Sequence, residues 1–205
     1  MAGGSVSARD IKYLPAALAA AVAAPAQAHL VETGFGGFYD GAAHLALTPA
    51  DLLLVIALAL FAGQRGTPAA RWTLFTLPAA WLMGGVLGAH LPGESTLPLP
   101  TTLSLGLAGV LIALDLKLHA TVIAGLALVA GLVHGYVNGA TMTPDGASLL
   151  GLAGAVTAVF CVLAILAAQV TTLQAGWTRI AVRVAGSWIA ASGLLMLGWL
   201  ARPLL

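Results

Sequence analysis

Six apolar stretches, each near the length that crosses a lipid bilayer, constrain the fold of this chain more than any other feature of its sequence. A helix needs about 20 apolar residues to span hydrocarbon, and in lipid the backbone N–H and C=O groups must pair with each other, as they do in a helix. We therefore predict an all-α, polytopic membrane bundle. Its six transmembrane helices are expected over residues 47–63, 72–89, 99–114, 118–142, 147–170 and 180–200.

The composition agrees with a membrane protein and excludes several other classes. The chain is 60% hydrophobic and only 7% charged, far from the roughly 25% charged residues of soluble domains. Its 205 residues leave room for one helical bundle, and a net charge of +1 argues against nucleic acid as a partner. The single cysteine, Cys161, can form no disulfide within the chain and is predicted to be a small core residue.

The N-terminal region has the pattern of an export signal. Arg9 and Lys12 precede a short apolar run that ends in Ala-Gln-Ala, the small-x-small pattern found before a signal-peptidase site. The pattern predicts a cleavable signal peptide over residues 1–28 and a transmembrane domain over residues 29–205, which begins at His29. An uncleaved membrane anchor is the alternative.

Basic residues fall on alternate connections between the predicted spans. Five of them follow the first, third and fifth spans: Arg65, Arg71, Lys117, Arg179 and Arg183. The opposite side has only Arg202. By the positive-inside rule, those three connections are cytoplasmic. This orientation agrees with a cleaved signal, since both place the N-terminus outside.

Residues 131–139, Gly-Leu-Val-His-Gly-Tyr-Val-Asn-Gly, combine glycine and polar residues inside a predicted span. Glycines at every fourth position form a stripe on which a neighbouring helix can approach closely. His134 and Asn138 share this spacing and lie beside the stripe. An ionisable residue within the membrane is costly, so we interpret His134 as a candidate functional residue. The alternative is a histidine that only forms a hydrogen bond between two helices.

Metal-ligating side chains gather towards the predicted outer side of the membrane. Imidazole and carboxylate groups with few thiols suit Ni²⁺, Co²⁺, Zn²⁺ or Cu²⁺. The candidate metal ligands are His29, His44, Asp51, His90 and His134, with Asp40, Glu94 and Asn138 in support. We expect the divalent metal to be transported or transiently bound, and no permanently bound cofactor.

These candidates also have purely structural interpretations. Asp51 follows Thr48 by three residues, as a helix capping box requires. His44 is either a ligand or a buried histidine that forms a hydrogen bond. His90 and Glu94 are either ligands or ordinary solvated loop residues.

A smaller polar group lies at the predicted cytoplasmic edge. Asp115 and His119 are four residues apart and would face one way on a helix. Because Lys117 lies between them, we interpret them as an interfacial charge cluster.

Three segments resemble the HupE/UreJ family of hydrogenase- and urease-accessory membrane proteins. They are Gly-Phe-Gly-Gly-Phe-Tyr-Asp-Gly-Ala-Ala-His over residues 34–44, Ala-Gly-Gln-Arg-Gly over residues 62–66, and Gly-Leu-Val-His-Gly-Tyr over residues 131–136. The resemblance implies a small helical permease that takes up nickel or cobalt for metalloenzyme assembly. It also implies that His44, Asp51 and His134 line the path of the metal.

The chain departs from the family's pattern in its first span. That span usually begins with a His-Pro pair and then an Asp-His pair, whereas here Leu45 follows His44 and Leu52 follows Asp51. We therefore place the chain in a divergent branch. We expect a multi-pass protein of the bacterial inner membrane, whose partners are the lipid bilayer and a divalent metal ion.

Three classes of function remain open. The first is a metal-ion permease, driven by a gradient or by downhill binding and sequestration inside, because no ATP-binding motif is present. The second is an intramembrane metal-dependent hydrolase, with His44, His90 and His134 as ligands and Asp51 as base. The third is a non-transporting accessory protein whose glycine faces bind partner helices or a second copy of the chain.

Overall fold

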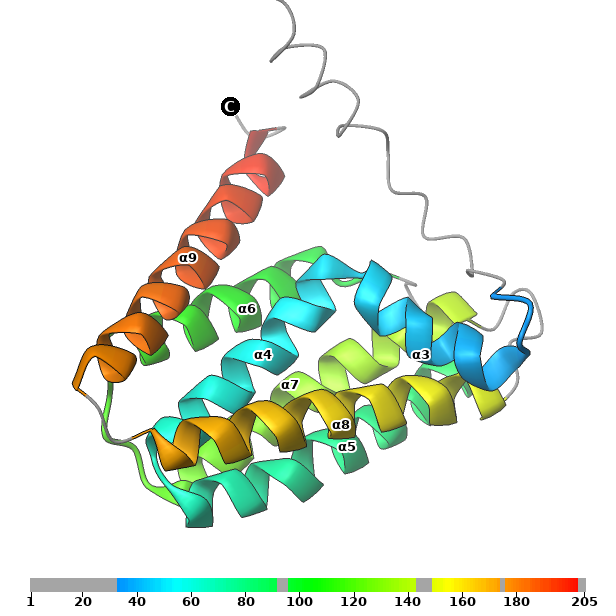
Figure 1. The fold of residues 1–205 in the computed structure, drawn as a ribbon. Helices are drawn as coiled ribbons and strands as arrows, with labels where there is room; N and C mark the ends of the chain where they lie inside the picture. Colours follow the sequence, from blue (N-terminus) through cyan, green and yellow to red (C-terminus); the bar gives the residue numbers. More distant parts are fainter. Residues whose placement is uncertain (1–32, 92–95, 143–148, 174–175, 203–205) are drawn as a thin grey trace, which may run out of the picture.

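The computed structural model describes residues 33–91, 96–142, 149–173 and 176–202, and these segments are predominantly helical (Figure 1). The helices within them are α3 (Gly37–Leu47), α4 (Pro49–Gln64), α5 (Thr67–His90), α6 (Pro98–Ala113), α7 (Ala120–Met142), α8 (Leu149–Thr172) and α9 (Gly176–Leu200). The all-α prediction is confirmed for this part of the chain. The predicted signal peptide lies outside the described residues.

The helix lengths indicate how many times the described chain can cross a membrane. Helices α5, α7, α8 and α9 are long and apolar enough to span it, and α3 with α4 forms a possible fifth span that is bent by 79°. Helix α6 is apolar but has 16 residues, about 24 Å at 1.5 Å per residue, which is less than the hydrocarbon thickness. By length, the described residues therefore supply four or five spans rather than the six predicted.

Helix α3 lies directly before the first predicted span. It ends before Thr48 because Pro49 disfavours helical geometry in the residue that precedes it, and α4 begins at Pro49, where a proline is well tolerated. Helix α3 lies along α8, and Gly41 touches the backbone of Gly151 so closely that a Cβ on Gly41 would clash. The first predicted span is thus the second part of a bent helical pair.

Helices α5 and α7 form the most extensive helix pair of the bundle. The stripe of Gly131, Gly135 and Gly139 faces α5, and a Cβ on Gly135 would collide with the carbonyl group of Trp81. This contact confirms that the stripe allows a close helix approach. Its partner is a helix of the same chain, so the stripe gives no support to docking of a separate protein there.

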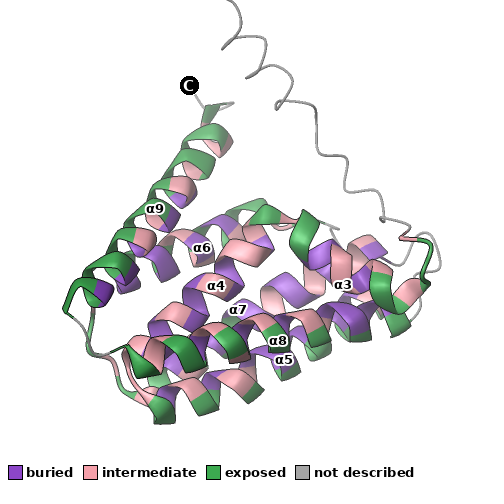
Figure 2. Ribbon diagram, viewed as in Figure 1, coloured by how far each residue is buried: buried purple, intermediate pink, exposed green. Residues whose placement is uncertain are grey.

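Helix α4 lies among α5, α6, α7 and α8 and carries the core of the bundle (Figures 1 and 2). Leu54, Val55 and Phe61 of α4 are completely buried. Helices α6 and α9 form a second close pair, while α9 leaves Trp188 and Trp199 on its outer face. A bundle that exposes apolar side chains outwards in this way fits a lipid environment.

Two local predictions are wrong. Cys161 is exposed on α8 rather than buried in the core, because a bundle in lipid can place apolar residues on its outside. Asp115 and His119 lie in the connection between α6 and α7, where Asp115 has a φ of 52°, so they do not share a helix face. Asp115 instead forms ion pairs with Arg65 and Arg179. The interpretation as a charge cluster therefore applies to Asp115 but not to His119.

Candidate functional site

Asp51 enters the core from the first turn of α4. Thr48 precedes this helix, but its hydroxyl donates a hydrogen bond to the carbonyl oxygen of His44 at 2.9 Å and caps no N–H group of α4. The capping-box interpretation of Asp51 is therefore wrong. The carboxylate is free to face α7, and an acid in the first helical turn is also favoured by the helix dipole.

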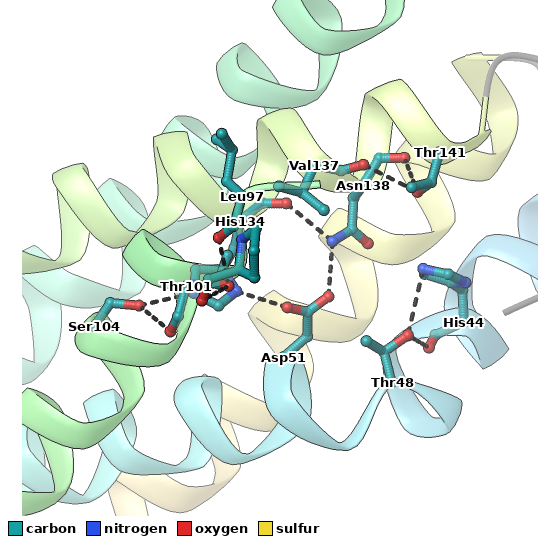
Figure 3. Close-up of polar contacts among 11 residues, drawn as sticks. His44, Thr48, Asp51, Leu97, Thr101, Ser104, His134, Val137, Asn138 and Thr141 are labelled. Carbon is teal, nitrogen blue, oxygen red and sulfur yellow. Dashed lines mark hydrogen bonds and ion pairs between the residues drawn. The ribbon is translucent and has the colours of Figure 1, made fainter. Parts of the chain in front are cut away.

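His134 is the partner of Asp51. Its side chain is completely buried in α7, and its Nδ1 lies 2.6 Å from Oδ1 of Asp51 (Figure 3). On the other side of the ring, Nε2 lies 2.8 Å from the hydroxyl oxygen of Ser104 in α6. The indole of Trp81 covers the imidazole, with 5.8 Å between ring centroids. One imidazole thus joins α4 to α6 across α7.

Asn138 forms a hydrogen bond with the second oxygen of the same carboxylate. Its Nδ2 donates to Oδ2 of Asp51 at 2.7 Å and to the backbone carbonyl of His134 at 2.9 Å. Its side-chain Oδ1 is buried and has no hydrogen-bond partner among the described residues. Buried amide oxygens are normally satisfied, so this oxygen is an acceptor available to a ligand. We call Asp51, Ser104, His134 and Asn138 the buried polar cluster.

The hydroxyl of Ser104 lies between two partners. It donates a hydrogen bond to the carbonyl oxygen of Thr101 at 2.8 Å, and its oxygen is 2.8 Å from Nε2 of His134. Which atom donates in the contacts of His134 with Ser104 and Asp51 depends on the tautomer of the imidazole.

His44 lies at the edge of the buried polar cluster. It is 7% exposed on α3, and its Nε2 is 3.4 Å from the hydroxyl oxygen of Thr48. Figure 3 shows its ring joined by a dashed line to Thr48, with no hydrogen bond drawn to Asp51 or Asn138. The bend between α3 and α4 thus places an imidazole close to the start of α4, without a hydrogen bond to the carboxylate.

The remaining candidate ligands do not join this group. Asp40, in the first turn of α3, accepts hydrogen bonds from the backbone and hydroxyl of Thr33. His90 is exposed at the end of α5, where its Nδ1 is 2.8 Å from the carbonyl oxygen of Val86. His29 and Glu94 lie outside the described residues.

Within the described segments, no three His, Cys, Asp or Glu side chains lie close enough together to hold a metal ion. The structure therefore brings together Asp51, His134 and Asn138 and leaves His44 and His90 outside these contacts. The ligand set required for the hydrolase hypothesis is not assembled. The sequence prediction also missed Ser104 and Trp81, whose residue types carry no distinctive signal in an apolar helix.

The family model for HupE / UreJ protein matches residues 17–196 of the chain. This range includes every member of the buried polar cluster and His44. No curated protein and no solved structure matches the chain.

Proposed function

This chain belongs to the HupE/UreJ family, and we propose that it is a membrane permease that moves Ni²⁺ or Co²⁺ through the buried polar cluster. The family supports a general role in nickel or cobalt handling, either as a transporter or as an accessory protein. The proposal of transport depends on one observation, which is the contact at 2.6 Å between Asp51 and His134 in the core of the bundle.

The energetics of burial support a functional role for this contact. Asp51 is 6% exposed and His134 is not exposed at all. Ionisable groups within a membrane bundle are costly and mark ion pathways or proton relays in many membrane proteins. An apolar pair at these positions would pack α4 against α7 without that cost. A cation that binds the carboxylate and the imidazole would explain why both ionisable groups are buried in the core.

The chemistry of the donors fits the proposed substrate. Imidazole nitrogen and carboxylate or amide oxygen suit borderline divalent ions such as Ni²⁺ and Co²⁺. Asp51, His134 and the unpartnered oxygen of Asn138 supply one donor of each kind. A site with so few protein ligands leaves coordination positions for water and binds weakly enough to release its ion, as conduction requires.

His44 is suited to deliver the ion to Asp51. It is nearly buried, it precedes the helix that carries Asp51, and its ring has only a long contact of 3.4 Å with the hydroxyl of Thr48 among the described residues. In the orientation predicted from the basic residues, α3 and the start of α4 are on the outer side. A metal ion would then meet His44 before the Asp51–His134 pair.

Entry of a cation into the pair replaces the hydrogen bond between Asp51 and His134. A metal ligand must be deprotonated, and Oδ1 of Asp51 lies 2.6 Å from Nδ1 of His134. A divalent ion that binds both atoms therefore takes the place of the hydrogen between them, so protons and metal compete for this site.

The test is uptake of radiolabelled nickel, and separately of cobalt, by cells that express the full chain. Asp51→Asn keeps the size of the side chain and removes its charge, so uptake per folded molecule should fall at least about tenfold, the effect of roughly 1.4 kcal/mol in binding or barrier height. Thr73→Val is the matched control, because Thr73 is also buried but lies outside the cluster. Equal uptake by Asp51→Asn and the wild type would contradict the proposal.

A further inference from the structure

A second polar region lies at the far end of α4 from Asp51. Asp51 is in the first turn of α4 and Gln64 is its last residue, so about 20 Å of helix separates them at 1.5 Å per residue. A pocket of about 530 Å³ opens there, between the ends of α4 and α8 and the start of α9. This volume is typical of ligand pockets. None of the proposed metal ligands lines the pocket.

The pocket is positively charged. Arg65, Lys117 and Arg179 all line it. Asp115 forms ion pairs with two of them, and Nε of Arg179 donates to its Oδ2 at 2.6 Å. One carboxylate against three cations leaves an excess of two positive charges. A divalent cation would be repelled here, so this pocket is not a binding site for the metal.

Several polar atoms at the pocket have no partner among the described residues. They are both side-chain amide atoms of Gln64 and the Nε of Arg65. Each of these atoms is buried, and a buried polar atom without a hydrogen bond is costly. Helix α9 also begins at the pocket, with Gly176 in its wall, and the N–H groups of a helix start favour an anion.

We propose that this pocket binds a phosphate-bearing anion. A phosphate group has enough acceptor oxygens to use the free Nε of Arg65, the amide N–H of Gln64 and the ammonium of Lys117 together. The carbonyl oxygen of Gln64 would accept a hydrogen bond from a hydroxyl on the phosphate or on the glycerol attached to it. This proposal is independent of the metal permease.

The phosphate has two possible sources, an anionic phospholipid headgroup or a soluble phosphate. Basic pockets between transmembrane helices on the cytoplasmic side are known binding sites for anionic lipid headgroups. Val170 and Val182 form an apolar part of the wall, against which the start of an acyl chain can pack. Both sources share the same recognition of phosphate, and the experiment below separates them.

The test is native mass spectrometry of the purified full chain with phosphatidylglycerol, with phosphatidylcholine, and with inorganic phosphate as a competitor. Lys117→Gln combined with Arg179→Gln should weaken phosphatidylglycerol binding at least about tenfold, because charge-assisted hydrogen bonds are lost. Asp115 keeps its ion pair with Arg65 in this variant. Gln64→Glu, which adds a negative charge to the pocket, should cause a similar loss without changing that ion pair.

Arg71→Gln is the matched control. Arg71 is exposed and, like Arg65, follows the first predicted span on the predicted cytoplasmic side. It lines a different pocket. Displacement of phosphatidylglycerol by inorganic phosphate would identify phosphate itself as the ligand, and resistance to phosphate would identify the lipid. The proposal is overturned if phosphatidylcholine binds as tightly as phosphatidylglycerol, if neither phosphatidylglycerol nor phosphate binds, or if Arg71→Gln causes the same loss as the pocket variants.

Discussion

Asp51 and His134 are 83 residues apart in the sequence, yet Oδ1 of the carboxyl group and Nδ1 of the imidazole are 2.6 Å apart in the core. Each group is held from a second side, Asp51 by the amide of Asn138 and His134 by the hydroxyl of Ser104. The pair is therefore fixed in position by Asn138 of α7 and Ser104 of α6 besides its own contact, and three helices, α4, α6 and α7, meet at it. A rigid site of this kind can bind the same ion in each transport cycle.

Substitution of His134 separates a role in transport from a role in packing. His134→Gln keeps groups that can form hydrogen bonds with Asp51 and Ser104, so we expect the free energy of unfolding to change by less than about 1 kcal/mol, in the range of single membrane hydrogen bonds. Nickel uptake should nevertheless be lost, because an amide is a poor ligand for nickel. Thermal unfolding and uptake, both measured on folded protein, give the two results. Wild-type uptake would remove His134 from the mechanism.

His134→Ala should behave differently from His134→Gln. It leaves a cavity and removes the partner of a buried carboxyl group, so a loss of stability of about 1–3 kcal/mol is expected. Uptake should be lost in both variants. A stability loss without any loss of uptake per folded molecule would mean that His134 only joins the helices.

The glycine stripe gives a prediction about stability alone. Gly135→Ala places a Cβ against the backbone carbonyl of Trp81, which cannot move easily, so a loss of about 1–3 kcal/mol is expected. Gly125→Ala, in the same helix, meets nothing within 4 Å and should be neutral or slightly stabilising. Thermal unfolding in detergent measures both. Equal effects would contradict the close packing of α5 on α7.

The sequence singled out three members of the buried polar cluster but not their geometry. Asp51, His134 and Asn138 were recognisable because polar residues are rare in apolar stretches. The contact between Asp51 and His134 could not be predicted, since it depends on how α4 packs across α7. Ser104 gave no signal because serine in a membrane helix commonly bonds its own backbone, as Ser104 also does with Thr101.

Helix α3 shows why the bend at Thr48 was not predicted either. The segment is rich in glycine, and Gly37 and Gly41 both lower helix propensity. In the structure Gly41 instead allows α3 to touch the backbone of α8. Tertiary packing therefore overrides local propensity and stabilises the helix that holds His44.

The orientation of the bundle can be tested by chemical labelling. Thr67 and Thr96 are both exposed. Thr67 is the first residue of α5, and Thr96 follows the end of that helix in the sequence. In a Cys161→Ala background, Thr96→Cys should react with an impermeant thiol reagent in intact cells, whereas Thr67→Cys should react only after lysis. Labelling of Thr67→Cys in intact cells would reverse the predicted topology.

The pH dependence of nickel binding tests the Asp51–His134 pair as a metal site. Nickel affinity should fall as the pH falls, because protons compete with the metal for the carboxylate and the imidazole. Titration calorimetry of the purified protein at several pH values measures this affinity. Asp51→Asn should bind nickel more weakly than the wild type at every pH. A nickel affinity that does not change with pH would contradict binding at this pair.

Transport by the isolated protein is the most direct test of the central claim. The full chain is reconstituted into proteoliposomes that contain a nickel-sensitive dye, and the rate of nickel entry is compared for the wild type and Asp51→Asn. We predict entry into wild-type vesicles that is at least about tenfold faster than into Asp51→Asn vesicles, equivalent to roughly 1.4 kcal/mol. Absence of entry with folded wild-type protein, or equal entry with both proteins, would contradict a permease that works through Asp51 and His134.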